Sequence, residues 1–98
     1  MKVRFKDDRL ERLETDPQFT DGHSGAIVKA FRARLNFIRQ AVDERDLYAM
    51  KSFRFEKLQG PRNHQHSVRL NDQWRLIIEL EGTAPHKTIV IVSIEDYH

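Results

Sequence analysis

The sequence contains no cysteine, so neither a disulfide framework nor a thiolate metal site can stabilise the fold. It has no apolar run long enough to cross a membrane, and its first ten residues lack the hydrophobic stretch of a signal peptide. Internal repeats and low-complexity tracts are absent as well. These absences favour a protein that stays in the cytoplasm, has no membrane partner and folds around an ordinary core.

The residues that are present suffice for one small domain. Of the 98 residues, 39% are hydrophobic and 33% are charged, which is enough for one core and too apolar for a disordered chain. We therefore expect a single domain over residues 1–98 that folds as a monomer without a metal or other cofactor.

The first half of the chain is typical of helices that follow one short strand. Residues 2–5 alternate in polarity and predict an edge strand, and residues 7–15 predict a short helix before Pro17. The clearest pattern covers residues 24–42, where apolar side chains recur every three or four positions, at Ile27, Phe31, Leu35, Ile38 and Val42. The opposite stripe, which includes Lys29, is typical of a solvated helix face. Residues 43–50 add a further helical turn.

The second half predicts strands at residues 53–58, 64–70, 74–80 and 87–94. Gly60-Pro61 and Asn71-Asp72 supply turns between them, the second as a tight hairpin. Helices followed by adjacent strands predict an α+β fold, in which a mostly antiparallel sheet of four or five strands packs against the N-terminal helices.

Basic residues are concentrated in the strand region. Between residues 51 and 75, six basic residues stand against the two acidic residues Glu56 and Asp72; the basic ones are Lys51, Arg54, Lys57, Arg62, Arg69 and Arg75. Such a concentration is expected of a surface that meets phosphates, and equally of a solvated pair of strands.

The two-residue period of strands places Arg75 on the face opposite Trp74, Leu76, Ile78 and Leu80. The hairpin then brings Arg69 near Arg75. Two arginines on one sheet face can grip a phosphate, and salt bridges to Glu79 or Glu56 are the structural alternative. Trp74 is expected to be a core anchor.

The chain ends in Asp96-Tyr97-His98, directly after the most apolar strand. These residues offer a carboxylate, an aromatic hydroxyl and an imidazole, groups that RNA cleavage by its own 2′-hydroxyl can use. His64 and His66 face the same side of their strand, but no third ligand stands at a suitable spacing, so we expect no metal site.

Three stretches together carry a family resemblance: Arg-Phe-Glu-Lys-Leu-Gln-Gly-Pro-Arg at 54–62, His-Ser-Val-Arg-Leu-Asn-Asp-Gln-Trp-Arg-Leu at 66–76, and Glu-Asp-Tyr-His at 95–98. In order and spacing they resemble HigB-type toxins, the plasmid-maintenance killer family of the RelE/ParE toxin-antitoxin superfamily. The second half of the chain resembles the family closely, and the first half resembles it in layout.

The resemblance implies a ribosome-dependent endoribonuclease that cuts mRNA in the 70S ribosome and arrests translation. A helix-turn-helix antitoxin of the HigA kind would neutralise it, and operator DNA would be bound only through that complex. Arg75 would stabilise the scissile phosphate and His98 would transfer protons, while Tyr97 holds the substrate and Asp96 orients its neighbours. Backbone phosphates would meet four further basic residues: Arg54, Lys57, Arg62 and Arg69.

The chain departs from the family pattern at three positions. It has Glu56 and Gln59 where several active members have histidine and lysine, and Asn71 where some have arginine. The loss of these groups implies a slow enzyme, or one that depends more heavily on Arg75 and His98. Two other functions therefore stay open: a ParE-like toxin that inhibits gyrase, and a weakly catalytic member that mainly binds its partners.

Overall fold

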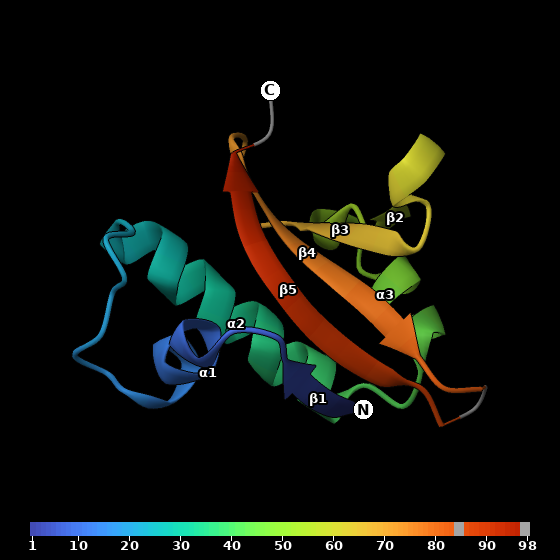
Figure 1. Cartoon of the computed structure of the whole chain (residues 1–98), viewed down its shortest axis with the longest axis horizontal. Coiled ribbons are helices and arrows are strands. Elements are labelled where there is room, and N and C mark those ends of the chain that lie inside the picture. Colours follow the sequence, from blue (N-terminus) through green and yellow to red (C-terminus); the bar gives the residue numbers. More distant parts are fainter. Residues whose placement is uncertain (84–85, 97–98) are drawn as a thin grey trace.

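The computed structural model describes residues 1–83 and 86–96, which form one five-stranded sheet with three α-helices (Figure 1). In chain order the elements are β1 (Lys2–Phe5), α1 (Asp8–Thr15), α2 (Gly25–Gln40), α3 (Glu44–Ala49), the 3₁₀ turn η1 (Lys51–Phe53), β2 (Glu56–Lys57), the 3₁₀ turn η2 (Gly60–Arg62), β3 (Gln65–Arg69), β4 (Trp74–Glu81) and β5 (Thr88–Asp96). The strand order is β1-β5-β4-β3-β2, with β1 parallel to β5 and every other pair antiparallel. The α+β prediction and the edge position of residues 2–5 are confirmed.

The long helix α2 forms one side of the core. Ser24 caps its first turn by accepting a hydrogen bond from the backbone N–H of Ile27 at 3.3 Å. Phe31, Leu35 and Ile38 are fully buried against the sheet. The prediction that Val42 continues this stripe was wrong, because Ala41 is extended and ends the helix, which leaves Val42 81% exposed.

The strands β4 and β5 present alternate side chains to the core, as the two-residue period predicts. Leu76 and Ile78 lie in the core, whereas Arg75 lies on the opposite face of β4. On β5 the register shifts by one residue, because Ser93 pairs with Ile77 while Ile91 pairs with Ile78. This bulge keeps the N-terminal half of β5 in the core and turns Ser93 and Glu95 to the other face.

The hairpin between β3 and β4 is closed by the side chain of Asn71. Its Oδ1 accepts hydrogen bonds from the backbone N–H groups of Gln73 and Trp74, both at 2.8 Å. Trp74 packs half-buried against the core, with its ring edge-on to His23. The turn was placed correctly from sequence, and the tryptophan is the expected anchor.

The strand predicted at residues 53–58 was wrong in extent, since only Glu56 and Lys57 pair with β3. Residues 51–53 instead form a 3₁₀ turn, and Arg54 takes the left-handed conformation with φ 44° and ψ 48°. A left-handed residue turns the chain away from the sheet, so β2 cannot begin before it.

None of the helices within the described ranges is long and apolar enough to cross a membrane.

His66 is a buried histidine on the core face of β3. Its ring stacks on Phe55 with 4.8 Å between ring centroids and meets Tyr48 edge-on. Burial lowers the pKa of His66 because it disfavours the imidazolium; Glu44 opposes the shift, and Lys57 and Lys87 add to it. The folded chain therefore holds His66 neutral at a pH where the unfolded chain protonates it.

This difference predicts pH-dependent stability. Because the folded pKa lies below the unfolded value, the contribution of His66 is present above the unfolded pKa and is lost as the pH falls below it. The urea midpoint of the wild type should drop more between pH 7.5 and pH 5.5 than that of His66→Gln. Equal drops in the two proteins would show that His66 is protonated equally in both states.

Candidate functional site

The face of the sheet opposite the core, the open face, carries Arg69 and Arg75, two of the residues that the sequence assigned to RNA contact. Strand register lines its side chains up in rows that cross the sheet. One row contains Glu56, Ser67, Ile77 and Ser93, and the next contains Arg69, Arg75 and Glu95. The site is thus assembled from four strands.

Arg75 and Arg69 are direct cross-strand partners, as predicted. Arg75 is only 7% exposed, which is unusual for a charged side chain. Arg69 forms an ion pair with Asp72 of the hairpin. The alternative partner Glu79 instead accepts hydrogen bonds from Lys6 at 3.2 Å and from Gln65 at 3.0 Å. The hairpin therefore places a buried guanidinium beside a half-buried one.

A groove of about 340 Å³ lies on this face between β5 and the segment around β2. Its lining consists of Glu56, Lys57, Leu58, Gln59, Arg62, Ile77 and Glu95. Two of the three positions at which the sequence departs from the HigB pattern, Glu56 and Gln59, are in this lining. The groove therefore brings together the basic groups of Lys57 and Arg62 and the acidic groups of Glu56 and Glu95.

An ion pair between Arg62 and Glu95 joins two sides of the groove. Arg62 Nη1 and Nη2 donate to the two carboxylate oxygens of Glu95 at 2.9 and 2.8 Å, and Arg62 Nε donates to Gln65 at 2.9 Å. Ser93 donates to the same carboxylate at 2.7 Å. The hydrogen bonds from Arg62 hold the pKa of Glu95 below its usual range. In the free chain Arg62 therefore binds a carboxylate, a pairing that sequence reasoning missed.

The terminal motif is described as far as Asp96. Asp96 pairs with Trp74 in the sheet register, and its carboxylate accepts a hydrogen bond from Gln73 at 3.0 Å. These contacts fix the end of β5 beside the hairpin and next to Arg75. Tyr97 and His98 lie outside the described residues.

The two remaining predicted phosphate ligands lie around β2. Lys57 is exposed and pairs with His66, so its strand position faces away from that of Glu56. Arg54 is exposed just before the strand. Lys57 therefore points away from the row of Glu56, although it still lines one side of the groove.

The two histidines considered as metal ligands diverge. His64 is exposed with its Nε2 3.8 Å from Glu79, whereas His66 is buried beside Phe55. Within residues 1–83 and 86–96, no three acidic or histidine side chains come together as a metal site would require.

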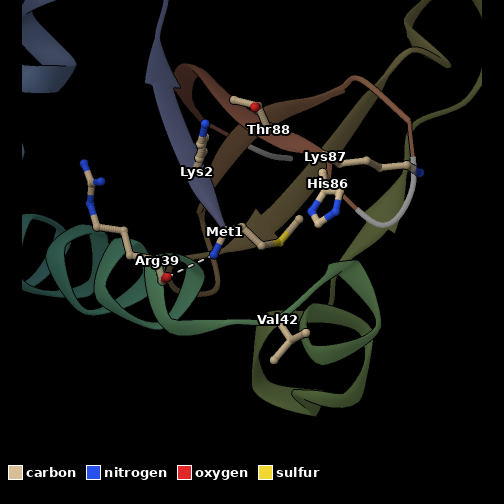
Figure 2. Close-up of a pocket in the computed structure, with 7 residues that line it drawn as sticks. All are labelled: Met1, Lys2, Arg39, Val42, His86, Lys87 and Thr88. Carbon is tan, nitrogen blue, oxygen red and sulfur yellow. Dashed lines mark hydrogen bonds between the residues drawn. The ribbon is translucent and has the colours of Figure 1, made fainter.

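A larger cavity of about 560 Å³ lies at the other end of the sheet, near the start of β5 (Figure 2). It too is surrounded by basic groups, but Arg39 is bound to Glu14 and Lys87 to Glu44. The N-terminal ammonium of Met1 donates to three carbonyls at the end of α2, among them that of Arg39 at 2.9 Å. Its cations are thus largely neutralised, and we assign it no role.

Solved structures with the same fold are toxins. The YoeB/ParE toxin from Agrobacterium tumefaciens has a TM-score of 0.57 at 14% identity, and covers 100% of each chain. The YoeB-YefM complex from Staphylococcus aureus has a TM-score of 0.60 at 20% identity, and covers 100% of this chain and 97% of that one. The fold is therefore that of the YoeB- and RelE-like toxins.

Sequence comparison narrows the class. The family described as "RelE-like toxin of type II toxin-antitoxin system HigB" matches residues 3–98. Toxin HigB-1 of Vibrio cholerae serotype O1 is 33% identical over 94 residues, which is 89% of this chain and 99% of the relative. The chain belongs to the HigB-like family of type II toxins, whose RelE-like members are ribonucleases in general.

The Arg62–Glu95 pair predicts that one substitution increases anion binding in the groove. Glu95→Gln should release Arg62 and remove a negative charge, so a labelled single-stranded RNA 12-mer should bind several-fold more tightly. The plot of log affinity against log salt should be steeper by about 0.7, the value for one additional phosphate contact. Fluorescence anisotropy across a salt titration measures both quantities.

Glu81→Gln is the matched control, because Glu81 pairs with Arg4 on the open face away from the groove. It should leave RNA affinity near the wild-type value. Weaker binding by Glu95→Gln would mean that Glu95 positions Arg62 for RNA and does not compete with it.

Proposed function

We propose that this toxin is a ribosome-dependent endoribonuclease that cleaves mRNA in the 70S ribosome, acts in the cytoplasm and arrests translation. The observation that carries the proposal is the buried Arg75, which lies between Arg69 and Glu95 in one row of the open face, beside a groove. A buried guanidinium beside a groove suits stabilisation of charge that develops on a phosphate.

The chemistry is attack of a ribose 2′-hydroxyl on the adjacent phosphorus. A general base removes the 2′-hydroxyl proton, the new oxygen–phosphorus bond forms, and the bond to the 5′-oxygen breaks as a general acid protonates that oxygen. The products are a 2′,3′-cyclic phosphate and a free 5′-hydroxyl. No metal ion is needed for this sequence of steps.

Residue roles follow from position and chemistry. Arg75 stabilises the pentacovalent phosphate, and His98 transfers a proton, since its imidazole titrates near neutral pH. Tyr97 holds or stacks on the substrate. Asp96, bound to Gln73, fixes the backbone immediately before both residues.

The remaining basic residues bind the RNA backbone. Arg62 and Arg69 exchange their carboxylate partners for phosphates, and such exposed ion pairs contribute at most about 1 kcal/mol each. Arg54 and Lys57 contact phosphate from the edge at β2.

The acidic lining of the groove favours a second candidate, a weakly catalytic toxin that mainly binds its partners. Glu56 and Glu95 both line the groove, and both repel an incoming phosphate. We therefore expect cleavage to be slow, with Arg75 and His98 carrying most of it.

The partner that restrains the toxin is an antitoxin. The similar YoeB-YefM assembly from Staphylococcus aureus is titled a heterotetrameric toxin-antitoxin complex, which supports such a pairing for this chain. We propose a helix-turn-helix antitoxin of the HigA kind, through which the pair reaches operator DNA.

The test is expression without antitoxin. Arg75→Ala, or removal of His98, should relieve growth arrest, because the loss of one such group costs about a hundredfold or more in rate. Lys29→Ala, on the exposed face of α2, is the control and should arrest growth as the wild type does. The measurement is the mapping of message 5′ ends with and without ribosomes.

Cuts that appear only with ribosomes and vanish in both site variants support the proposal. Arrest that persists in both variants, with intact messages and inhibited gyrase, would identify a ParE-like toxin. A wild type that neither arrests growth nor cuts messages would identify the binding-only member.

A further inference from the structure

The outer edge of the sheet is left open beside Arg69. The pairing of Glu56 with Ser67 would, if continued, place Arg54 opposite Arg69. Arg54 is instead in the left-handed conformation, and its backbone N–H donates to Lys51 at 3.1 Å. The backbone carbonyl of Arg69 thus loses the strand partner that a longer β2 would provide.

A side chain from the long helix donates the missing hydrogen bond to this carbonyl. Arg34 of α2 donates from Nε to the carbonyl oxygen of Arg69 at 3.0 Å. Its guanidinium lies over the ring of Phe53, 4.8 Å from the ring centroid. Phe53 immediately precedes Arg54. Arg34 therefore contacts Arg69 and the residue next to Arg54, two positions that lie far from it in sequence.

The positive charge at this corner is poorly neutralised. Arg34 and Arg54 belong to none of the ion pairs formed within residues 1–83 and 86–96. Arg69 pairs with Asp72, whose side chain is 97% exposed. Burial lowers the pKa of Arg34, and the nearby Arg69 lowers it further, as expected for like charges close together. This differs from the cavity of Figure 2, where Glu14 and Glu44 neutralise Arg39 and Lys87.

We propose that Arg34, Arg54 and Arg69 form a phosphate-binding corner that anchors the RNA backbone beside the cleavage site without taking part in the chemistry. The proposal rests on the proposed function, since Arg69 is the cross-strand partner of Arg75. Arg34 uses Nε for the carbonyl, and its Nη1 and Nη2 donate to no group of residues 1–83 and 86–96, so they are available to a ligand. A guanidinium held in this way by a hydrogen bond and an aromatic ring is preorganised for a phosphate, and the bound anion relieves the repulsion between the arginines.

The experiment measures the binding of a labelled single-stranded RNA 12-mer to Arg34→Gln by fluorescence anisotropy across a salt titration. Affinity should fall about tenfold, as expected for one charge-assisted hydrogen-bonded contact, and the salt slope should decrease by about 0.7. Arg34→Lys keeps the charge but not the planar fork, so its slope should stay at the wild-type value while its affinity falls. Lys29→Gln removes one charge from the same helix and is the control that should bind as the wild type does.

Half-maximal cleavage on ribosomes should require a higher concentration of Arg34→Gln than of the wild type, because the corner binds the RNA backbone. RNA affinity of Arg34→Gln equal to that of the wild type overturns the proposal, and so does a loss confined to antitoxin binding. Arg54→Gln changes an exposed position and should also reduce the salt slope. It replaces Arg34→Gln in the experiment if Arg34→Gln does not fold. A wild type that binds RNA through Arg34 yet never cuts messages would reject the nuclease and retain the corner.

Discussion

The alternation of side chains along β4 is the constraint on which the rest of the structure depends. Leu76 and Ile78 belong to the same buried cluster as Phe31, Leu35 and Ile38 of α2. Their burial obliges Arg75 to lie on the open face. A shift of register by one residue would put the guanidinium into the core, where an unpaired charge is strongly destabilising. The packing of the core therefore also determines on which face of the sheet Arg75 lies.

The bulge on β5 extends this constraint to a second strand. Without it, strict alternation would send either Ile91 or Ile94 out of the core. With it, Ile91 is buried and Ile94 packs partly buried against the core, and Glu95 comes to lie beside Arg75. The same bulge therefore completes the hydrophobic layer and brings a carboxylate to the groove, where it holds Arg62.

Sequence reasoning succeeded where a repeating pattern controls the outcome. The period of α2, the two faces of β4 and the turn at Asn71 follow from local spacing, so the fold and the approach of Arg69 to Arg75 were predictable. Arg34 could not be found in this way, because its role depends on the left-handed conformation of Arg54, which removes a strand partner elsewhere in the chain. The ion pair of Arg62 with Glu95 likewise depends on the bulge in β5, and no short sequence motif predicts that bulge.

The arginines around the site differ in what a phosphate would gain from them. For Arg62 and Arg69, an incoming phosphate replaces a carboxylate, so one anionic partner is exchanged for another and the net electrostatic gain is small. For Arg34 and Arg54, no acid of the described residues is displaced, and the repulsion at the corner is reduced when the anion arrives. Affinity should therefore come mainly from Arg34 and Arg54 at the edge of the sheet, while the paired Arg62 and Arg69 set position and register. Because most of the affinity comes from the edge of the sheet, the toxin can bind RNA even though the carboxylates of Glu56 and Glu95 line the groove.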